Sequence, residues 1–289
     1  MLSDTKETGG STVENNSQVK AHYDALLGRT YTWMMGGAST NFEENRKFFD
    51  LHGLRPPTVD AKALDLGCGS GFQAIPLLEL GYAVIAIDMS ADLLQELKGH
   101  KEALARKVSG QSPLPSLTLI EGDILRLRAL LPSDALASVD LAVCMGDTLT
   151  HLQSTAQVQS LVKNAVSFLK PGGTLILHFR DLTRHLEGTD RFLPCRTDEN
   201  NIFTCVLEYE EAQETFLDGR DKEDRFVLIN DLLYTRPDAS APWTFKKSQY
   251  KKLEVPPEEV LKMMQDAGMD TSFHPLAFGV VAVMGRKKP

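Results

Sequence analysis

The sequence lacks three features that would place the protein at a membrane or in an oxidising compartment. No apolar run approaches the roughly 18 residues of a membrane span, and the N-terminus lacks the basic-then-apolar profile of a signal peptide. The four cysteines, Cys68, Cys144, Cys195 and Cys205, include no C-x-x-C pair, and no cysteine–histidine cluster is present. We therefore expect a cytoplasmic protein with free thiols, no membrane contact and no bound metal.

The chain also has fewer basic than acidic residues. The chain has 31 basic and 39 acidic residues, which gives a net charge of −8. This balance works against a polyanionic partner such as nucleic acid. A small-molecule partner is the expectation.

The length of 289 residues fits one large α/β domain with an insertion. Residues 1–17 have almost no apolar content, which predicts a disordered tail, and residues 18–60 form an expected helical arm. Residues 61–200 and 256–289 form the expected core. Between them, residues 201–255 have the periodicity of β-strands, which predicts a lid or a contact in a homo-oligomer.

A glycine-rich segment follows the first predicted strand of the core. The apolar run that ends at Leu66 is followed by Gly67, Gly69 and Gly71, and a helix is expected from about Phe72. Glycines let the backbone approach a ligand, and the first amides of the helix stay unpaired. The spacing is neither the dinucleotide pattern G-x-G-x-x-G nor the phosphate loop G-x-x-x-x-G-K-[ST]. A ligand without phosphates fits better.

An acidic residue ends the second predicted strand. Asp88 lies 17 positions after Gly71, where an α/β nucleoside site places its acceptor for two ribose hydroxyls. It could instead cap the next helix, although Ser90 is better placed for that. We expect Asp88 to bind a ribose.

Asp65 and the three glycines together resemble the D-x-G-x-G-x-G loop of class I S-adenosylmethionine-dependent methyltransferases. In that family the loop wraps the methionine end of the cofactor. The resemblance implies a Rossmann-like, seven-stranded, mostly parallel sheet with flanking helices, and an antiparallel β insertion after strand 5. The expected cofactor-binding residues are Tyr23, Trp33, Asp65, Gly67, Cys68, Gly69, Gly71, Asp88, Met89, Asp123, Ile124, Met145 and Gly146.

Some of these residues have a second interpretation. Tyr23, Tyr31 and Trp33 of the arm offer aromatic faces suited to covering a sulfonium cation, but each can also simply pack the arm on the core. In the resemblance, the segment around Asp123 meets the adenine edge. Asp123 could equally cap the helix that follows.

The segment from Cys144 to Leu152, CMGDTLTHL, resembles the corresponding part of the glycine N-methyltransferase branch. That branch has an amide where this chain has Asp147. The segment lacks the Asn/Asp-Pro-Pro-aromatic pattern of enzymes that methylate bases in nucleic acid. His151 is expected near the site of methyl transfer, where it is either structural or catalytic.

Arg180 ends the fifth predicted strand and therefore points to the same crevice as Asp88 and Gly146. A guanidinium there suits bidentate capture of a carboxylate, and the glycine N-methyltransferase branch also has an arginine at this place. The alternative is an ion pair with Asp181 or Asp147 and no ligand.

These residues predict N-methylation of a small, carboxylate-bearing amine. Arg180 would hold the carboxylate, and His151, Asp147 or a tyrosine such as Tyr31 would help remove a proton. Three alternatives remain: an O- or S-methyltransferase, a nicotinamide-dependent oxidoreductase, and a non-catalytic cofactor-binding regulator. The lysines of the insertion, Lys246, Lys247, Lys251 and Lys252, are expected to form a solvated strand face.

Overall fold

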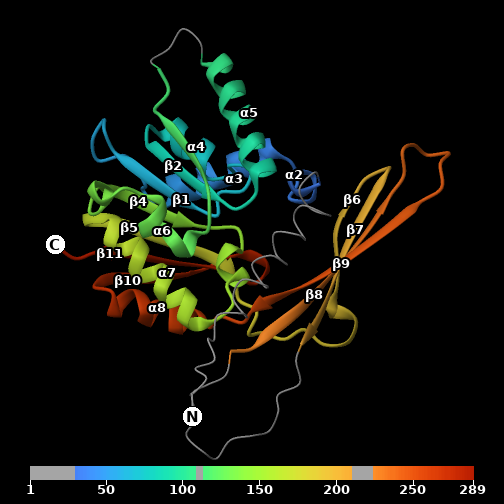
Figure 1. The fold of residues 1–289 in the computed structure, drawn as a ribbon. Helices are drawn as coiled ribbons and strands as arrows, with labels where there is room; N and C mark the ends of the chain where they lie inside the picture. The colour runs from blue at the N-terminus through green and yellow to red at the C-terminus, as the bar shows by residue number, and fades with distance from the viewer. Residues whose placement is uncertain (1–29, 109–112, 210–223) are drawn as a thin grey trace, which may run out of the picture.

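The computed structural model describes residues 30–108, 113–209 and 224–289, which form two β-sheets and their flanking helices (Figure 1). The predicted tail, the first part of the arm and Tyr23 lie outside these residues.

The larger sheet has seven strands in the order β10-β11-β5-β4-β1-β2-β3. The pairs β1–β2, β1–β4, β2–β3 and β4–β5 are parallel, whereas β11 is antiparallel to both β5 and β10. Its strands are β1 (Lys62–Leu66), β2 (Ala83–Asp88), β3 (Leu117–Glu121), β4 (Val139–Cys144), β5 (Leu169–Arg180), β10 (Met269–Pro275) and β11 (Val280–Lys287). The predicted fold class is confirmed.

Helices cover both faces of this sheet (Figure 1). One face carries α3 (Ala38–Leu51), α4 (Ala74–Leu80) and α5 (Ala91–Lys107), and the other carries α6 (Leu127–Leu130), α7 (Thr155–Phe168) and α8 (Pro257–Asp266). The short helix α2 (Tyr31–Met34) precedes them. Single 3-10 turns are η2 (Ile124–Arg126), η3 (Ser133–Ala135), η4 (Thr148–His151), η5 (Gly188–Arg191) and η6 (Ala277–Gly279).

Helix α7 illustrates how the sequence makes these layers. Val158, Leu161, Val162 and Ala165 recur at helical spacing and are fully buried against the sheet. The helix begins after Ser154, whose hydroxyl accepts a hydrogen bond from the amide of Gln157. One apolar stripe and one cap therefore fix the orientation of α7.

The strand order places a crevice between β1 and β4. The chain moves outward from β1 to β2 and β3, and then returns to the other side of β1 at β4. Ligands of open α/β sheets bind outside the carboxyl ends of the strands at such a reversal. The residues that follow β1, β2, β4 and β5 meet at this edge.

The second sheet is antiparallel, in the order β6-β7-β8-β9, and is inserted between β5 and α8. Its strands are β6 (Phe192–Thr197), β7 (Asn201–Tyr209), β8 (Phe226–Thr235) and β9 (Thr244–Leu253). The sheet thus begins at Phe192, not at residue 201. Strand β6 escaped prediction because it is an edge strand with a bulge, contains Pro194 and has no alternation of buried side chains.

The chain segments that lead into and out of the second sheet lie side by side. Nε2 of His185, before the sheet, is 2.7 Å from Oε1 of Glu254, after it. Leu253 and Val255 then enter the core of the large sheet. The chain therefore enters and leaves the second sheet at one place.

No helix among the described residues has the length and apolar character that a membrane span requires. Within the same ranges, no group of three or more His, Cys, Asp or Glu side chains could hold a metal ion. All four cysteines are free thiols, as expected.

Candidate active site

The loop after β1 requires glycine. Gly67, Gly69 and Gly71 all have positive φ, at 73°, 51° and 91°. A Cβ atom at Gly67 would lie 2.3 Å from Cγ2 of Thr148, and one at Gly71 would lie 2.2 Å from Cδ1 of Leu97. The loop backbone therefore sits directly against η4 and α5, where no larger residue fits.

Asp88 joins this loop to the end of β2. Its carboxylate accepts the amide of Gly69 at 2.8 Å and the amide of Ser90 at 2.9 Å. Ser90, not Asp88, caps α5 by accepting the amide of Leu93. Asp88 also lines the cleft beside the loop.

A cleft with about 830 Å³ of empty space, including its open mouth, lies beside the loop and Asp88. A second cavity adjoins it and shares Tyr31, Gly67 and Gly146 with it. Of the predicted site residues, the cleft is lined by Tyr31, Gly67, Gly69, Asp88, Met89, Asp123, Ile124, Gly146 and His151, and the second cavity also by Cys68 and Met145. Sequence patterns did not predict Ser90, Leu93, Thr148 and Leu152 in the first cavity, or Asn45, Gln73 and His178 in the second.

Two predicted cofactor residues, Trp33 and Gly71, line neither cavity. Trp33 packs against Phe203 and Leu233 of the second sheet. Gly71 contacts the core through Leu97. Asp123 lines the cleft and also accepts the amide of Leu125, so the two interpretations of this residue are compatible.

Asp65 is buried at the end of β1, with 1% of its surface exposed. Neither carboxylate oxygen has a hydrogen-bond partner of good geometry among the described residues. Burial, and then the charge of Asp88, raise the pKa of Asp65 to about 8, which the backbone amide of Ala74 only partly offsets. Asp65 lines neither cavity.

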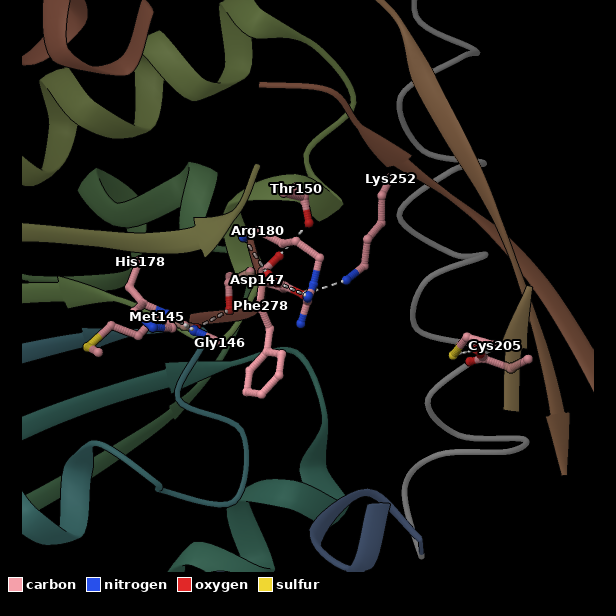
Figure 2. A network of polar contacts seen from close by, with 11 residues as sticks. Met145, Gly146, Asp147, Thr150, His178, Arg180, Cys205, Lys252 and Phe278 are labelled. Carbon is pink, nitrogen blue, oxygen red and sulfur yellow. Dashed lines mark hydrogen bonds and ion pairs between the residues drawn. The ribbon is translucent and has the colours of Figure 1, made fainter. Parts of the chain in front are cut away.

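At the end of β4, Asp147 is the centre of a polar network (Figure 2). Asp147 has a φ of 70°, and its carboxylate accepts the backbone amide of Arg180 at 2.7 Å and Nζ of Lys252 at 2.9 Å. Nε of Arg180 is 3.8 Å away. Burial raises the pKa of Asp147, but Lys252 and Arg180 outweigh burial and hold the pKa well below its usual range. Asp147 is therefore a poor proton acceptor, contrary to one expectation from the sequence.

Arg180 ends β5 and lines neither cavity. Its Nη1 donates to the carbonyl oxygen of Phe278 at 2.6 Å, while the guanidinium remains partly exposed. The expected ion pair with Asp147 is present at 3.8 Å, whereas Asp181 pairs with Arg184 instead. The guanidinium is thus held at the mouth of the crevice from two sides.

Three ring side chains surround the crevice. Tyr31 stacks on Phe72, and burial, followed by Asp88 and other carboxylates, raises the pKa of its phenol, which stays protonated. Nδ1 of His178 accepts the amide of Gly146 at 3.4 Å, and burial lowers the pKa of its imidazole, which stays neutral near pH 7. His151 stacks on Tyr250 of β9 with ring centroids 5.6 Å apart.

Comparison with known proteins agrees with this geometry. Residues 63–173 match the family described as "Methyltransferase domain". Human glycine N-methyltransferase is 27% identical over 146 residues, which cover 49% of this chain and 46% of that protein. A solved S-adenosylmethionine-dependent methyltransferase from Clostridium acetobutylicum has a TM-score of 0.64 and 16% identity, over 95% of this chain and 99% of that one. Residues 63–173 are therefore similar to a methyltransferase domain, and the fold is one that S-adenosylmethionine-dependent methyltransferases share.

A second relative is named for a different activity. The ubiquinone biosynthesis O-methyltransferase of Xanthomonas campestris pv. campestris is 28% identical over 137 residues, which cover 44% of this chain and 50% of that protein. The chain spans about half the length of the curated relatives it matches. The family match, residues 63–173, lies within the large sheet and its helices and ends before the second sheet begins.

Two residues of the network were not predicted as part of the site. Lys252 was expected on a solvated strand face, but only 12% of its side chain is exposed and it pairs with Asp147. Phe278 had no predicted role. His178, in contrast, had an available signal, because it lies two residues before Arg180 on one strand and so faces the same side.

Proposed function

We propose that the protein transfers a methyl group from S-adenosylmethionine to the amino group of a small, carboxylate-bearing amine. The observation that carries this proposal is the network around Asp147. It combines two cations, Arg180 and Lys252, with one carboxylate, so its net charge is one positive. A single carboxylate on the acceptor would neutralise it. The similarity to human glycine N-methyltransferase supports the same acceptor chemistry.

The cofactor side of the proposal rests on two groups that line the cleft. Asp88 would accept the ribose hydroxyls, and the loop at Gly67–Gly69 would lie against the methionine part. Asp65 lies buried outside both cavities, on the strand from which the loop begins. S-adenosylmethionine supplies, when bound, a methyl group already activated by a sulfonium centre.

On the acceptor side, the protein's main task is alignment. Arg180 and Lys252 hold the acceptor's carboxylate at the ends of β5 and β9, next to Gly146, which lines both cavities. Holding two reactants in line lowers a barrier by about 7–11 kcal/mol, so strong acid–base groups are not required. Fixed cations at one end of the acceptor are therefore sufficient to orient its amine.

The amine must lose a proton before it attacks, since an ammonium group has no lone pair. Asp147 is unsuited because its pKa is held low, and Tyr31 is unsuited because its phenol stays protonated. His178 is neutral and lines the second cavity, so we propose it as the proton acceptor. His151, which lines the cleft, is the alternative.

O-methylation is a second candidate, because the similarity to the Xanthomonas O-methyltransferase is as high as that to glycine N-methyltransferase. The cofactor residues would have the same roles. The acceptor would not need Arg180.

The test is transfer of labelled methyl from S-adenosylmethionine to a panel of amino acids, phenols and thiols. Arg180→Ala is compared with Arg184→Ala, whose side chain is 86% exposed, four positions further along the chain. Label on amino acids that is lost in Arg180→Ala and kept in Arg184→Ala supports the proposal. Label only on phenols, unaffected by either variant, favours the O-methyltransferase.

A further inference from the structure

Phe278 combines two unusual properties. It lies in the η6 turn between β10 and β11 with 90% of its surface exposed. Its φ of 58° and ψ of 35° place it in the left-handed region, which is a genuine outlier for a bulky residue. Neither core packing nor backbone preference explains an aromatic side chain at this position.

The turn is held in this conformation by the end of β5. The carbonyl oxygen of Phe278 accepts Nη1 of Arg180 at 2.6 Å, and the carbonyl oxygen of Gly279 accepts the amide of Asp181 at 2.8 Å. The amide of Leu276 also donates to the carbonyl of Val280. Strained residues that the surrounding structure fixes in this way cluster at ligand sites.

The same contacts place Phe278 at the proposed acceptor site. Arg180 links it to Asp147, and Figure 2 shows its ring on the same side of the network as the Arg180 guanidinium. A carboxylate on Arg180 would therefore lie beside the residue that carries the ring. The charged groups of the network supply polar contacts, and the ring supplies the apolar surface beside them.

We propose that Phe278 is the apolar wall of the acceptor site, and that the acceptor is an amino acid with an apolar side chain and not glycine. This inference rests on the proposed function. With the carboxylate on Arg180 and Lys252, a substituent on the acceptor's α-carbon packs against the ring. The acceptor would cover the exposed ring, and removal of this apolar surface from water would favour binding.

The experiment compares Phe278→Ala and Phe278→Gly with the control Phe273→Ala. Phe273 is an exposed phenylalanine on β10 of the same hairpin, where it pairs with Val283 of β11. Methyl transfer to glycine, alanine, leucine and phenylalanine is measured as kcat/KM, S-adenosylmethionine binding by calorimetry, and Tm by thermal unfolding.

We expect wild type and Phe273→Ala to prefer leucine or phenylalanine to glycine by 10-fold or more. Phe278→Ala should lose about 10- to 100-fold on the larger acceptors and less than 3-fold on glycine, since apolar pocket contacts discriminate by about this much. Cofactor affinity should not change. Phe278→Gly should keep or raise the Tm, because glycine tolerates positive φ. If Phe278 only stabilised the fold, the same substitution would lower the Tm.

Three results would overturn the inference. Equal losses on glycine and on the larger acceptors, or a lower Tm in Phe278→Gly, would make Phe278 a structural residue and leave the proposed function intact. No transfer by wild type to any amino acid would overturn the proposed function, and the inference with it.

Discussion

Nζ of Lys252 lies 2.9 Å from Oδ2 of Asp147, although the two residues are 105 positions apart in the chain. Lys252 belongs to β9 of the second sheet, and Asp147 follows β4 of the large sheet. The contact joins the inserted sheet to the crevice where the cofactor loop ends. It also fixes the ionised state of the carboxylate at the centre of the site.

Lys252→Met should weaken both folding and acceptor binding. It leaves Asp147 largely buried with a weaker partner, so we expect a loss of about 1–3 kcal/mol in the free energy of unfolding and at least a 10-fold rise in acceptor KM. Urea unfolding and steady-state kinetics measure the two effects. Lys247→Met, on the exposed part of β9, is the control. An unchanged KM would mean that Lys252 only supports the fold.

Asp88→Ala should reduce cofactor affinity. If its carboxylate accepts ribose hydroxyls, the loss should be about 1.5–3 kcal/mol, which raises the Kd for S-adenosylmethionine roughly 10- to 100-fold. Calorimetry measures this change. Asp92→Ala, in the first turn of α5, should bind normally. Equal affinities in the two variants would contradict the ribose role.

Asp65→Asn should remove a pH dependence of stability. The folded pKa of about 8 lies above the ordinary value of 3.8, so the stability contributed by Asp65 is complete below the lower value and is lost as the pH rises toward the upper one. The Tm of the variant, relative to wild type, should therefore increase between pH 5 and pH 8. Exposed Asp60→Asn should show no such trend. The same Asp65 variant should bind S-adenosylmethionine less tightly.

Gly67→Ala should destabilise the fold by about 2–4 kcal/mol, because φ is 73° and the new methyl group would meet Thr148. Gly99→Ala provides the matched control inside α5, where nothing lies within 4 Å of the added atom. That change should stabilise the protein by about 0.5–1 kcal/mol. Chemical denaturation of both variants checks the opposite signs.

Local sequence patterns were sufficient to predict the cofactor side of the crevice. Gly67, Asp88 and Gly146 each follow a buried strand, and parallel strands bring their carboxyl ends to one edge. The positions of these residues follow from the burial and direction of each strand, and a few neighbouring residues in the sequence are enough to predict both. The roles of the predicted site residues remain predictions until the variants are measured.

The acceptor side depends on contacts between distant segments, which no short window contains. Lys252 looked like one of several surface lysines until β9 was placed beside η4. Phe278 gained its position from a hydrogen bond to Arg180, 98 residues earlier. Trp33 shows the reverse case, since its aromatic ring fitted a cofactor role but packs against β7 and β8.

The contact between His185 and Glu254 holds together the two ends of the segment that carries the second sheet. Because the segment that enters the second sheet and the segment that leaves it are held together, any replacement between them needs to span only a short distance. A sheet from another methyltransferase could be grafted there without altering strand order in the cofactor half. Under the proposed function, exchange of residues 186–253 would change the acceptor side, Lys252 included, while the residues that line the cofactor cleft stay in place.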